Sequence, residues 1–166
     1  MTQYWTELAG LMAVFSVMIV APAFAACPQE LAIYEDSAGQ SLTFTPPPAQ
    51  GQAAEHAFSL RINGQDLQGI VMWSLDPERP NGIIMDNCPD GDVTGEELAA
   101  CTVWEGVIYG LKPNSDAGFL SKRGSDHAEA LLLPDLSRLV QHHVFKNPLS
   151  GPPKVDDVFK MKACQE

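Results

Sequence analysis

Four cysteines place the tightest constraint on how this chain folds, because all of them follow an apolar N-terminal segment that is typical of export. They are Cys27, Cys88, Cys101 and Cys164. An even number of cysteines in a small exported domain predicts disulfides, for which three pairings exist. We favour Cys88–Cys101, which closes a short local loop, and Cys27–Cys164, which joins the two ends of the domain. The spacings do not match the usual zinc patterns.

The N-terminal segment has the form of a signal peptide. Residues 8–20 read LAGLMAVFSVMIV, an uncharged stretch with the length of a signal peptide's apolar region. Pro22 breaks a helix, and Ala23-Phe24-Ala25 supplies the small residues needed for cleavage after Ala25. The residues before this stretch depart from the usual pattern, since they lack Lys and Arg and include Glu7.

Two alternatives to cleavage after Ala25 stay open. An uncleaved membrane anchor needs about 20 apolar residues, which this segment only just supplies. A lipoprotein is the other alternative, because Phe24-Ala25-Ala26-Cys27 resembles a bacterial lipobox. We expect a signal peptide over residues 1–25 and a single globular domain over residues 26–166. The mature protein is then periplasmic or secreted and does not insert into a membrane.

The chain is strongly acidic. Asp and Glu number 21 against 10 Lys and Arg, which gives a formal net charge of −11. Nucleic acid and anionic lipid surfaces repel such a protein, so neither is expected as a partner. Cations, basic proteins and neutral small molecules remain. The simpler interpretation is that the charge only maintains solubility.

Hydrophobic patterning predicts mainly antiparallel strands. The clearest signal is a hairpin whose strands meet at Asn63-Gly64, a dipeptide suited to the positive φ angles of a tight turn. In its first strand Phe58, Leu60 and Ile62 fall on one face. Strands are expected over residues 31–35, 41–45, 56–62, 67–74, 101–111 and 157–163, with a loop over residues 76–82.

A few short helices complete the expected fold. Thr94 and Glu97 form a capping box that predicts a helix from residue 95 to about residue 100. Ser125 caps an expected helix over residues 126–133, and Pro134 begins another that ends near His143. The predicted fold class is a small α+β domain, mainly antiparallel strands with two or three short helices, held by disulfides.

The acidic loop over residues 86–97, DNCPDGDVTGEE, resembles an EF-hand calcium loop. Gly91 occupies the turn position, whereas Cys88 stands where the third residue of such a loop would bind the ion. The alternative is a disulfide-closed turn that leads into the capped helix. The candidate calcium ligands are Asp86, Asp90, Asp92, Thr94 and Glu97. No other cofactor is expected.

Catalytic signals are weak. His127, His142 and Asp135 are candidate ligands of a zinc site. Histidines and aspartates at this spacing are also common as ordinary surface residues. Ser125, Asp126 and His127 are contiguous, and a catalytic triad rarely forms from neighbours in sequence. A non-enzymatic protein is favoured over a small secreted hydrolase.

We therefore expect an exported binding or modulating protein of the cell envelope. Its acidity suits a basic protein partner, because complementary charge steers association. A calcium-stabilised structural domain that uses residues 86–97 is the alternative. The sequence leaves the ligand and the oligomeric state open.

Overall fold

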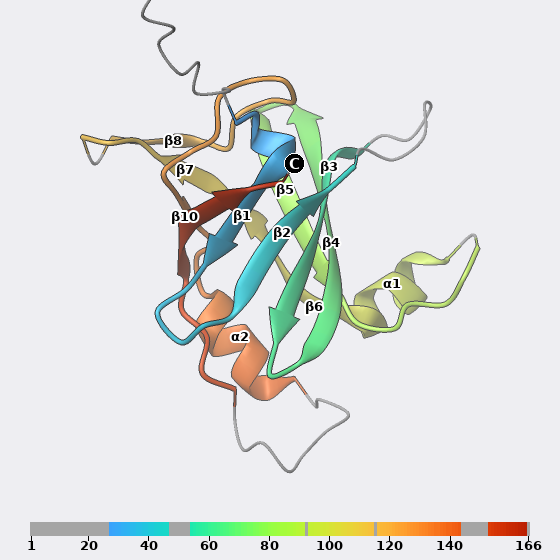
Figure 1. Cartoon of the computed structure of the whole chain (residues 1–166). Helices are drawn as coiled ribbons and strands as arrows, with labels where there is room; N and C mark the ends of the chain where they lie inside the picture. The colour runs from blue at the N-terminus through green and yellow to red at the C-terminus, as the bar shows by residue number, and fades with distance from the viewer. Residues whose placement is uncertain (1–26, 47–53, 92, 115, 144–152, 166) are drawn as a thin grey trace, which may run out of the picture.

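The computed structural model describes residues 27–46, 54–91, 93–114, 116–143 and 153–165. The expected signal peptide, residues 1–25, lies outside the described residues. Strand accounts for 50% of the structure and helix for 14%. The predicted α+β class is therefore wrong: the protein is a mostly antiparallel, nearly closed barrel-like sheet with two α-helices (Figure 1). Within the described ranges, no helix is long and apolar enough to cross a membrane.

The ten strands follow the order β6-β5-β4-β3-β2-β1-β10-β9-β7-β8 across the sheet. From β1 to β6 each strand pairs with the next one along the chain, and β10 returns to pair with β1. The strands are β1 (Ala32–Glu35), β2 (Ser41–Thr45), β3 (Ala54–Ile62), β4 (Gln65–Leu75), β5 (Glu78–Met85), β6 (Thr102–Val107), β7 (Tyr109–Leu111), β8 (Ala117–Phe119), β9 (Ala130–Leu132) and β10 (Val158–Cys164).

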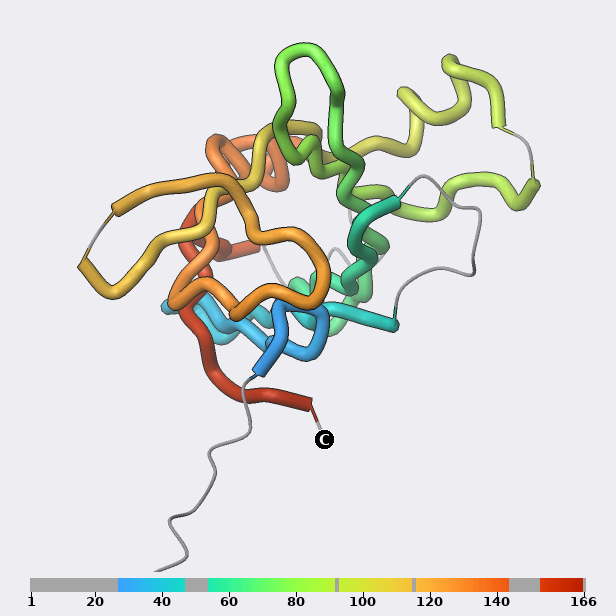
Figure 2. Tube along the Cα trace, turned by 90° about the horizontal axis from the view of Figure 1, so that it is seen from above, coloured from blue at the N-terminus to red at the C-terminus, as the bar shows by residue number. Residues whose placement is uncertain are grey.

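One bend brings the two ends of the sheet together. Strand β6 pairs with β5, and β7 pairs with β9. Only the fully buried Ile108 separates β6 from β7 along the chain, and its N–H donates to the Pro80 carbonyl at 3.3 Å. The chain therefore passes from one end of the sheet to the other, which is how the barrel nearly closes, as the view from above shows (Figure 2).

The hairpin predicted from Asn63-Gly64 forms as expected. Both residues have positive φ angles, 49° and 80°, which a tight hairpin turn requires. Phe58, Leu60 and Ile62 all point into the core, in agreement with the alternation seen in the sequence. Across the pair lies Gly69, where an added Cβ would stand 2.2 Å from the Phe58 ring. The ring of Phe58 therefore occupies the space above Gly69, and a larger residue there would displace it.

Two of the expected segments are strands instead. Residues 126–133, predicted to be helical, contain β9, which pairs with β7 on one side and β10 on the other. The Ala, Glu and Leu residues of this segment favour a helix locally, but pairing on both sides and burial of Leu131 override that preference. Residues 76–82, predicted to be a loop, mostly belong to β5, and only a short turn through the cis Asp76–Pro77 peptide remains.

One end of the barrel is covered by helix α2 (Leu136–His142), at the bottom of Figure 1. Leu136 and Val140 on this helix are fully buried, and the indole N–H of Trp104 donates to the Pro134 carbonyl at 2.8 Å. The carboxylate of Asp157 accepts from the N–H groups of Asp135 and Ser137 at 3.1 and 2.7 Å. Asp157 thus caps a helix whose own N-cap residue makes no side-chain cap.

At the opposite end, at the top of Figure 1, the connection after β8 contacts the start of β3. The buried His56 donates from Nε2 to the Ser121 carbonyl at 2.8 Å, and among the described residues no partner is found for its Nδ1. Burial lowers the pKa of His56 below its usual value, an effect that the Ser121 carbonyl and the nearby carboxylate of Glu55 oppose. Arg123 donates from Nη2 to the Glu55 carbonyl at 2.9 Å, which fastens this connection to β3.

The N-terminal part of the domain is held by a buried polar cluster. A short 3-10 helix, η1 (Gln29–Leu31), places the fully buried Gln29 beside Tyr34. Gln29 Nε2 donates to the Tyr34 hydroxyl at 2.9 Å, and this hydroxyl donates to the Ala128 carbonyl at 2.9 Å. Burial raises the pKa of Tyr34 to about 12, so the phenol stays protonated and keeps donating.

Candidate functional site

A segment between β5 and β6 projects from the barrel, and we call it the acidic arm (residues 86–101). It contains a turn followed by helix α1 (Gly95–Cys101) and extends away from the barrel in both ribbon views (Figures 1 and 2). Within α1 only Cys101 is buried. The helix therefore adds little to the core, and its ordered conformation must come from contacts within the arm and at its base.

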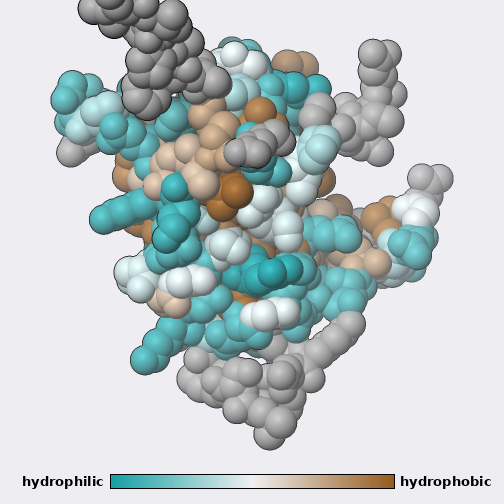
Figure 3. Space-filling view, in the orientation of Figure 1, coloured by the Kyte–Doolittle hydropathy of each residue, from teal (hydrophilic) through white to brown (hydrophobic). Residues whose placement is uncertain are grey.

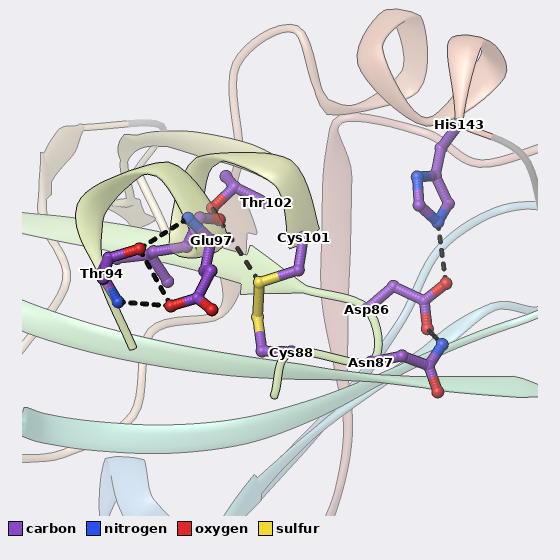
Figure 4. Close-up of a disulfide and its surroundings, with 9 residues drawn as sticks. Asp86, Asn87, Cys88, Thr94, Glu97, Cys101, Thr102 and His143 are labelled. Carbon is purple, nitrogen blue, oxygen red and sulfur yellow. Dashed lines mark hydrogen bonds and ion pairs between the residues drawn. A yellow bond between two sulfur atoms is a disulfide. The ribbon is translucent and has the colours of Figure 1, made fainter. Parts of the chain in front are cut away.

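A disulfide closes the arm. The structure pairs Cys88 with Cys101, with a Cα–Cα distance of 5.2 Å and a separation of 13 residues along the chain (Figure 4). The other pair joins Cys27 to Cys164, with a Cα–Cα distance of 5.9 Å. Both pairs are the ones favoured by the sequence, and both are consistent with disulfide bonds. The short loop fixes the two ends of the arm close to each other.

The capping box predicted for α1 is present. The Glu97 N–H donates to Thr94 Oγ1 at 3.3 Å, and the Thr94 N–H donates to Glu97 Oε2 at 2.8 Å (Figure 4). The Thr94 hydroxyl also donates to Glu97 Oε2, at 2.9 Å. These bonds lower the pKa of Glu97, because they favour its charged form. Glu97 is thus both a negative charge on the arm and part of what holds the helix.

The base of the arm is fastened to the barrel through Asp86. Its Oδ2 accepts from Gln65 Nε2 and from His143 Nε2, each at 2.9 Å. The side chain of Asp86 is 9% exposed, so this junction is largely shielded from water. Figure 4 shows His143 reaching this carboxylate from the end of α2. The arm is thereby connected to the helix that covers the barrel end.

The junction was missed by sequence reasoning. The sequence places His143 near the end of an expected helix, but nothing in the sequence relates it to Asp86. The two residues are 57 positions apart and meet only because the barrel brings the ends of β5 and α2 together.

The charged side chains of the arm are all acidic. Between Arg79 and Lys112 the chain contains no Lys, Arg or His. Asp90, Glu96 and Glu97 are exposed. The space-filling view shows the arm standing out from a barrel face that carries mainly hydrophilic and neutral side chains, with apolar ones scattered among them (Figure 3). Acidic positions from residue 80 to residue 111 are Asp86, Asp90, Asp92, Glu96, Glu97 and Glu105.

The predicted calcium ligands are engaged differently from those of an EF-hand loop. Asp86 accepts hydrogen bonds at the base of the arm, while Thr94 and Glu97 form the capping box. Asp90 is exposed, and Asp92 lies outside the described residues. Among the described residues no group of three or more His, Cys, Asp or Glu side chains is arranged to hold a metal ion. Calcium binding stays a prediction that the structure does not test.

One of the two histidines considered for catalysis, His127, has a structural partner. His127 Nδ1 donates to the Cys27 carbonyl at 2.9 Å, so the hydrogen bond that a triad would give to Asp126 is made to backbone instead. His142 is the last residue of α2, and Asp135 precedes the first. The hydrolase alternative gains no support from these positions.

Comparison with known proteins found no significant match to a protein-family model, a curated protein or a solved structure.

Proposed function

We propose that this chain is an exported, non-enzymatic binding protein of the cell envelope that docks on a basic protein partner through the acidic arm. The proposal is based on the arrangement of helix α1, which projects from the barrel. This helix ends at the disulfide that closes the arm, has a capping box at its start and contains no basic residue. Export, the partner and the absence of catalysis are parts of the proposal.

The energetics of the arm support a binding role. A segment that buries only Cys101 of its helix gains little from the hydrophobic effect. The disulfide and the capping box nevertheless hold it in one conformation. A binding segment that is already ordered loses less conformational entropy when it associates, which increases affinity.

The charge of the arm supports a basic partner. Neighbouring carboxylates with no basic side chain between them create a negative potential that steers a positive surface toward the arm. A purely solubilising charge would need neither the disulfide nor the fastening of Asp86 to Gln65 and His143. An inhibitor of a basic hydrolase is one concrete form that this function could take.

The test uses the mature protein as bait for envelope extract at low salt, followed by purification of the recovered partner and calorimetry. Reversal of two exposed charges, Asp90→Lys with Glu96→Lys, is expected to weaken binding at least about tenfold, because like charges then face each other. The matched control is Asp76→Lys with Asp116→Lys, which changes the net charge equally at exposed sites outside the arm. Repeating the titration with calcium and with EDTA tests the calcium alternative.

Equal weakening by the arm variant and its control would show that only net charge matters. No saturable partner at low salt would overturn the proposal as well. Loss of binding in EDTA that calcium restores would favour a calcium-dependent role for residues 86–97.

A further inference from the structure

A second surface lies on the side of the barrel away from the acidic arm. Figures 1 and 2 place β7 and β10 on the side opposite α1. There a cleft of about 610 Å³ runs over β7, β9 and β10, and we call it the basic cleft. Its charged lining consists of Lys112, His127, Glu129 and Lys160. The basic cleft is independent of the function proposed for the arm.

The charge of this cleft is opposite to that of the whole protein. Two lysines and one glutamate give its lining a net positive charge, in a chain whose net charge is −11. Lys112 and Lys160 are exposed, and neither makes an ion pair with any described residue. By contrast Lys122 pairs with Glu78 and Lys162 with Glu35. Both ammonium groups of the cleft therefore remain available to a ligand.

His127 is held with one ring nitrogen toward the backbone. Its Nδ1 and its backbone N–H both donate to the Cys27 carbonyl, at 2.9 and 3.2 Å. Because a carbonyl only accepts hydrogen bonds, Nδ1 carries a proton, and the Nε2 of the neutral ring is an acceptor for a ligand's donor group rather than a partner for a carboxylate. Cys27 is itself joined to Cys164 at the end of β10. The terminal disulfide thus supports the residue that orients His127.

The remaining walls of the cleft are apolar. Leu111, Pro113 and Met161 line it beside the charged groups. An adjoining hollow of about 510 Å³ shares Lys112, His127 and Glu129 with the cleft, but it adds the carboxylate of Asp126 and so lacks a net positive lining. A ligand of the cleft itself combines a negative group beside the lysines with an apolar group beside these walls.

We propose that the basic cleft binds a small carboxylate that carries an apolar group, with Lys112 and Lys160 around the carboxylate and Leu111, Pro113 and Met161 against the apolar part. Charge-assisted hydrogen bonds from ammonium groups to a carboxylate are stronger than neutral ones, which gives the ligand a fixed orientation. Glu129 disfavours a second negative charge on the ligand.

The experiment is an NMR titration of the uniformly ¹⁵N-labelled mature protein with hexanoate, and separately with acetate. Hexanoate is expected to give saturable shifts at the cleft with a Kd of about 1 mM, and acetate to bind at least about fivefold more weakly. Lys112→Gln with Lys160→Gln is expected to weaken hexanoate binding at least about tenfold. The matched control, Arg138→Gln with Lys154→Gln, removes the same charge at exposed positions outside the cleft and should change Kd less than about twofold.

Three outcomes would overturn this proposal. Hexanoate could cause no saturable shift at the cleft, or the two double variants could weaken binding equally, which would mean that only net charge attracts the anion. Equal affinity for acetate and hexanoate would remove the role of the apolar wall.

Discussion

The acidic arm and the basic cleft are built in opposite ways. The arm comes from one continuous segment, closed by a disulfide between cysteines 13 residues apart and by a capping box that spans three residues. The cleft assembles Lys112, His127 and Lys160 from three separate parts of the chain, beside a disulfide whose cysteines are 137 residues apart. Each disulfide supports one surface.

The comparison shows that opposite charges on one small barrel need different kinds of support. Contacts within the arm keep its carboxylates on an ordered projection, independently of most of the core. The cleft depends on β7, β9 and β10 keeping their register, so it should respond to any change that loosens the barrel. A substitution that disrupts the arm should therefore affect mainly the arm, whereas one that disrupts the strands under the cleft should also affect the barrel.

The largest effect is expected from removing the terminal disulfide with Cys27→Ser and Cys164→Ser. The chain-entropy account gives an upper value of about 5 kcal/mol for the loss in unfolding free energy, against about 3 kcal/mol for Cys88→Ser with Cys101→Ser. The terminal variant should also weaken hexanoate binding, because Cys164 ends β10, the strand that carries Lys160. Urea unfolding and the NMR titration measure the two effects.

The arm variant is the control for this prediction, since it should keep hexanoate binding while its α1 amides lose protection from hydrogen exchange. If removal of the arm disulfide destabilised the barrel more than removal of the terminal one, the arm would not be the independent unit described above.

A smaller effect is expected from acidification, through His56. Its folded-state pKa lies below the unfolded value of about 6.5, so the unfolded chain takes up the proton first as the pH falls. The contribution of neutral His56 to the free energy of unfolding is fully present above a pH of about 6.5. Below that pH it decreases by at most about 1.4 kcal/mol per pH unit. The connection that contacts His56 lines, through Ser121, the hollow beside the basic cleft, so this side of the barrel should loosen before the arm.

His56→Gln keeps a donor for the Ser121 carbonyl and removes the titration. Unfolding free energies of both proteins between pH 7.5 and pH 5 give the comparison, and the variant should show the shallower decline. Glu55, Glu30 and Arg123 lie near His56 and are unchanged in the variant. Identical slopes would mean that His56 is not the group that responds to acid.

The smallest global effect is expected from Thr94→Ala. Loss of this cap typically costs a helix about 1 kcal/mol. Because α1 buries only Cys101, the loss should appear as faster amide exchange in residues 95–101 with little change in the melting temperature. A fall in melting temperature comparable to that of a core substitution would show that α1 is coupled to the barrel more strongly than its burial indicates.

Local signals explain which elements were predicted well. The Asn63-Gly64 turn, the capping box at Thr94 and the alternation in β3 depend on neighbours in sequence, and each appears as expected. Residues 126–133 and 76–82 were assigned wrongly because their pairing partners lie on other strands. Because these two segments form strands, the sheet extends into a nearly closed barrel instead of the predicted α+β domain.

The candidate site divides in the same way. The acidic loop, its disulfide and its capped helix could be read from residues 86–101, because everything that shapes them lies within that segment. The Asp86–His143 hydrogen bond could not be predicted, since its two residues come from distant elements. The same holds for Lys112, His127 and Lys160, which no spacing pattern relates.

The sequence by itself therefore determined the acidic arm with its Cys88–Cys101 pair and the main hairpin, because short-range geometry and turn chemistry are sufficient for them. Only the tertiary structure decided the closure of the barrel, the fastening of the arm to α2 and the position of the basic cleft. These features depend on strand register across the whole sheet, where each residue's neighbours are set by the packing of distant segments around one core.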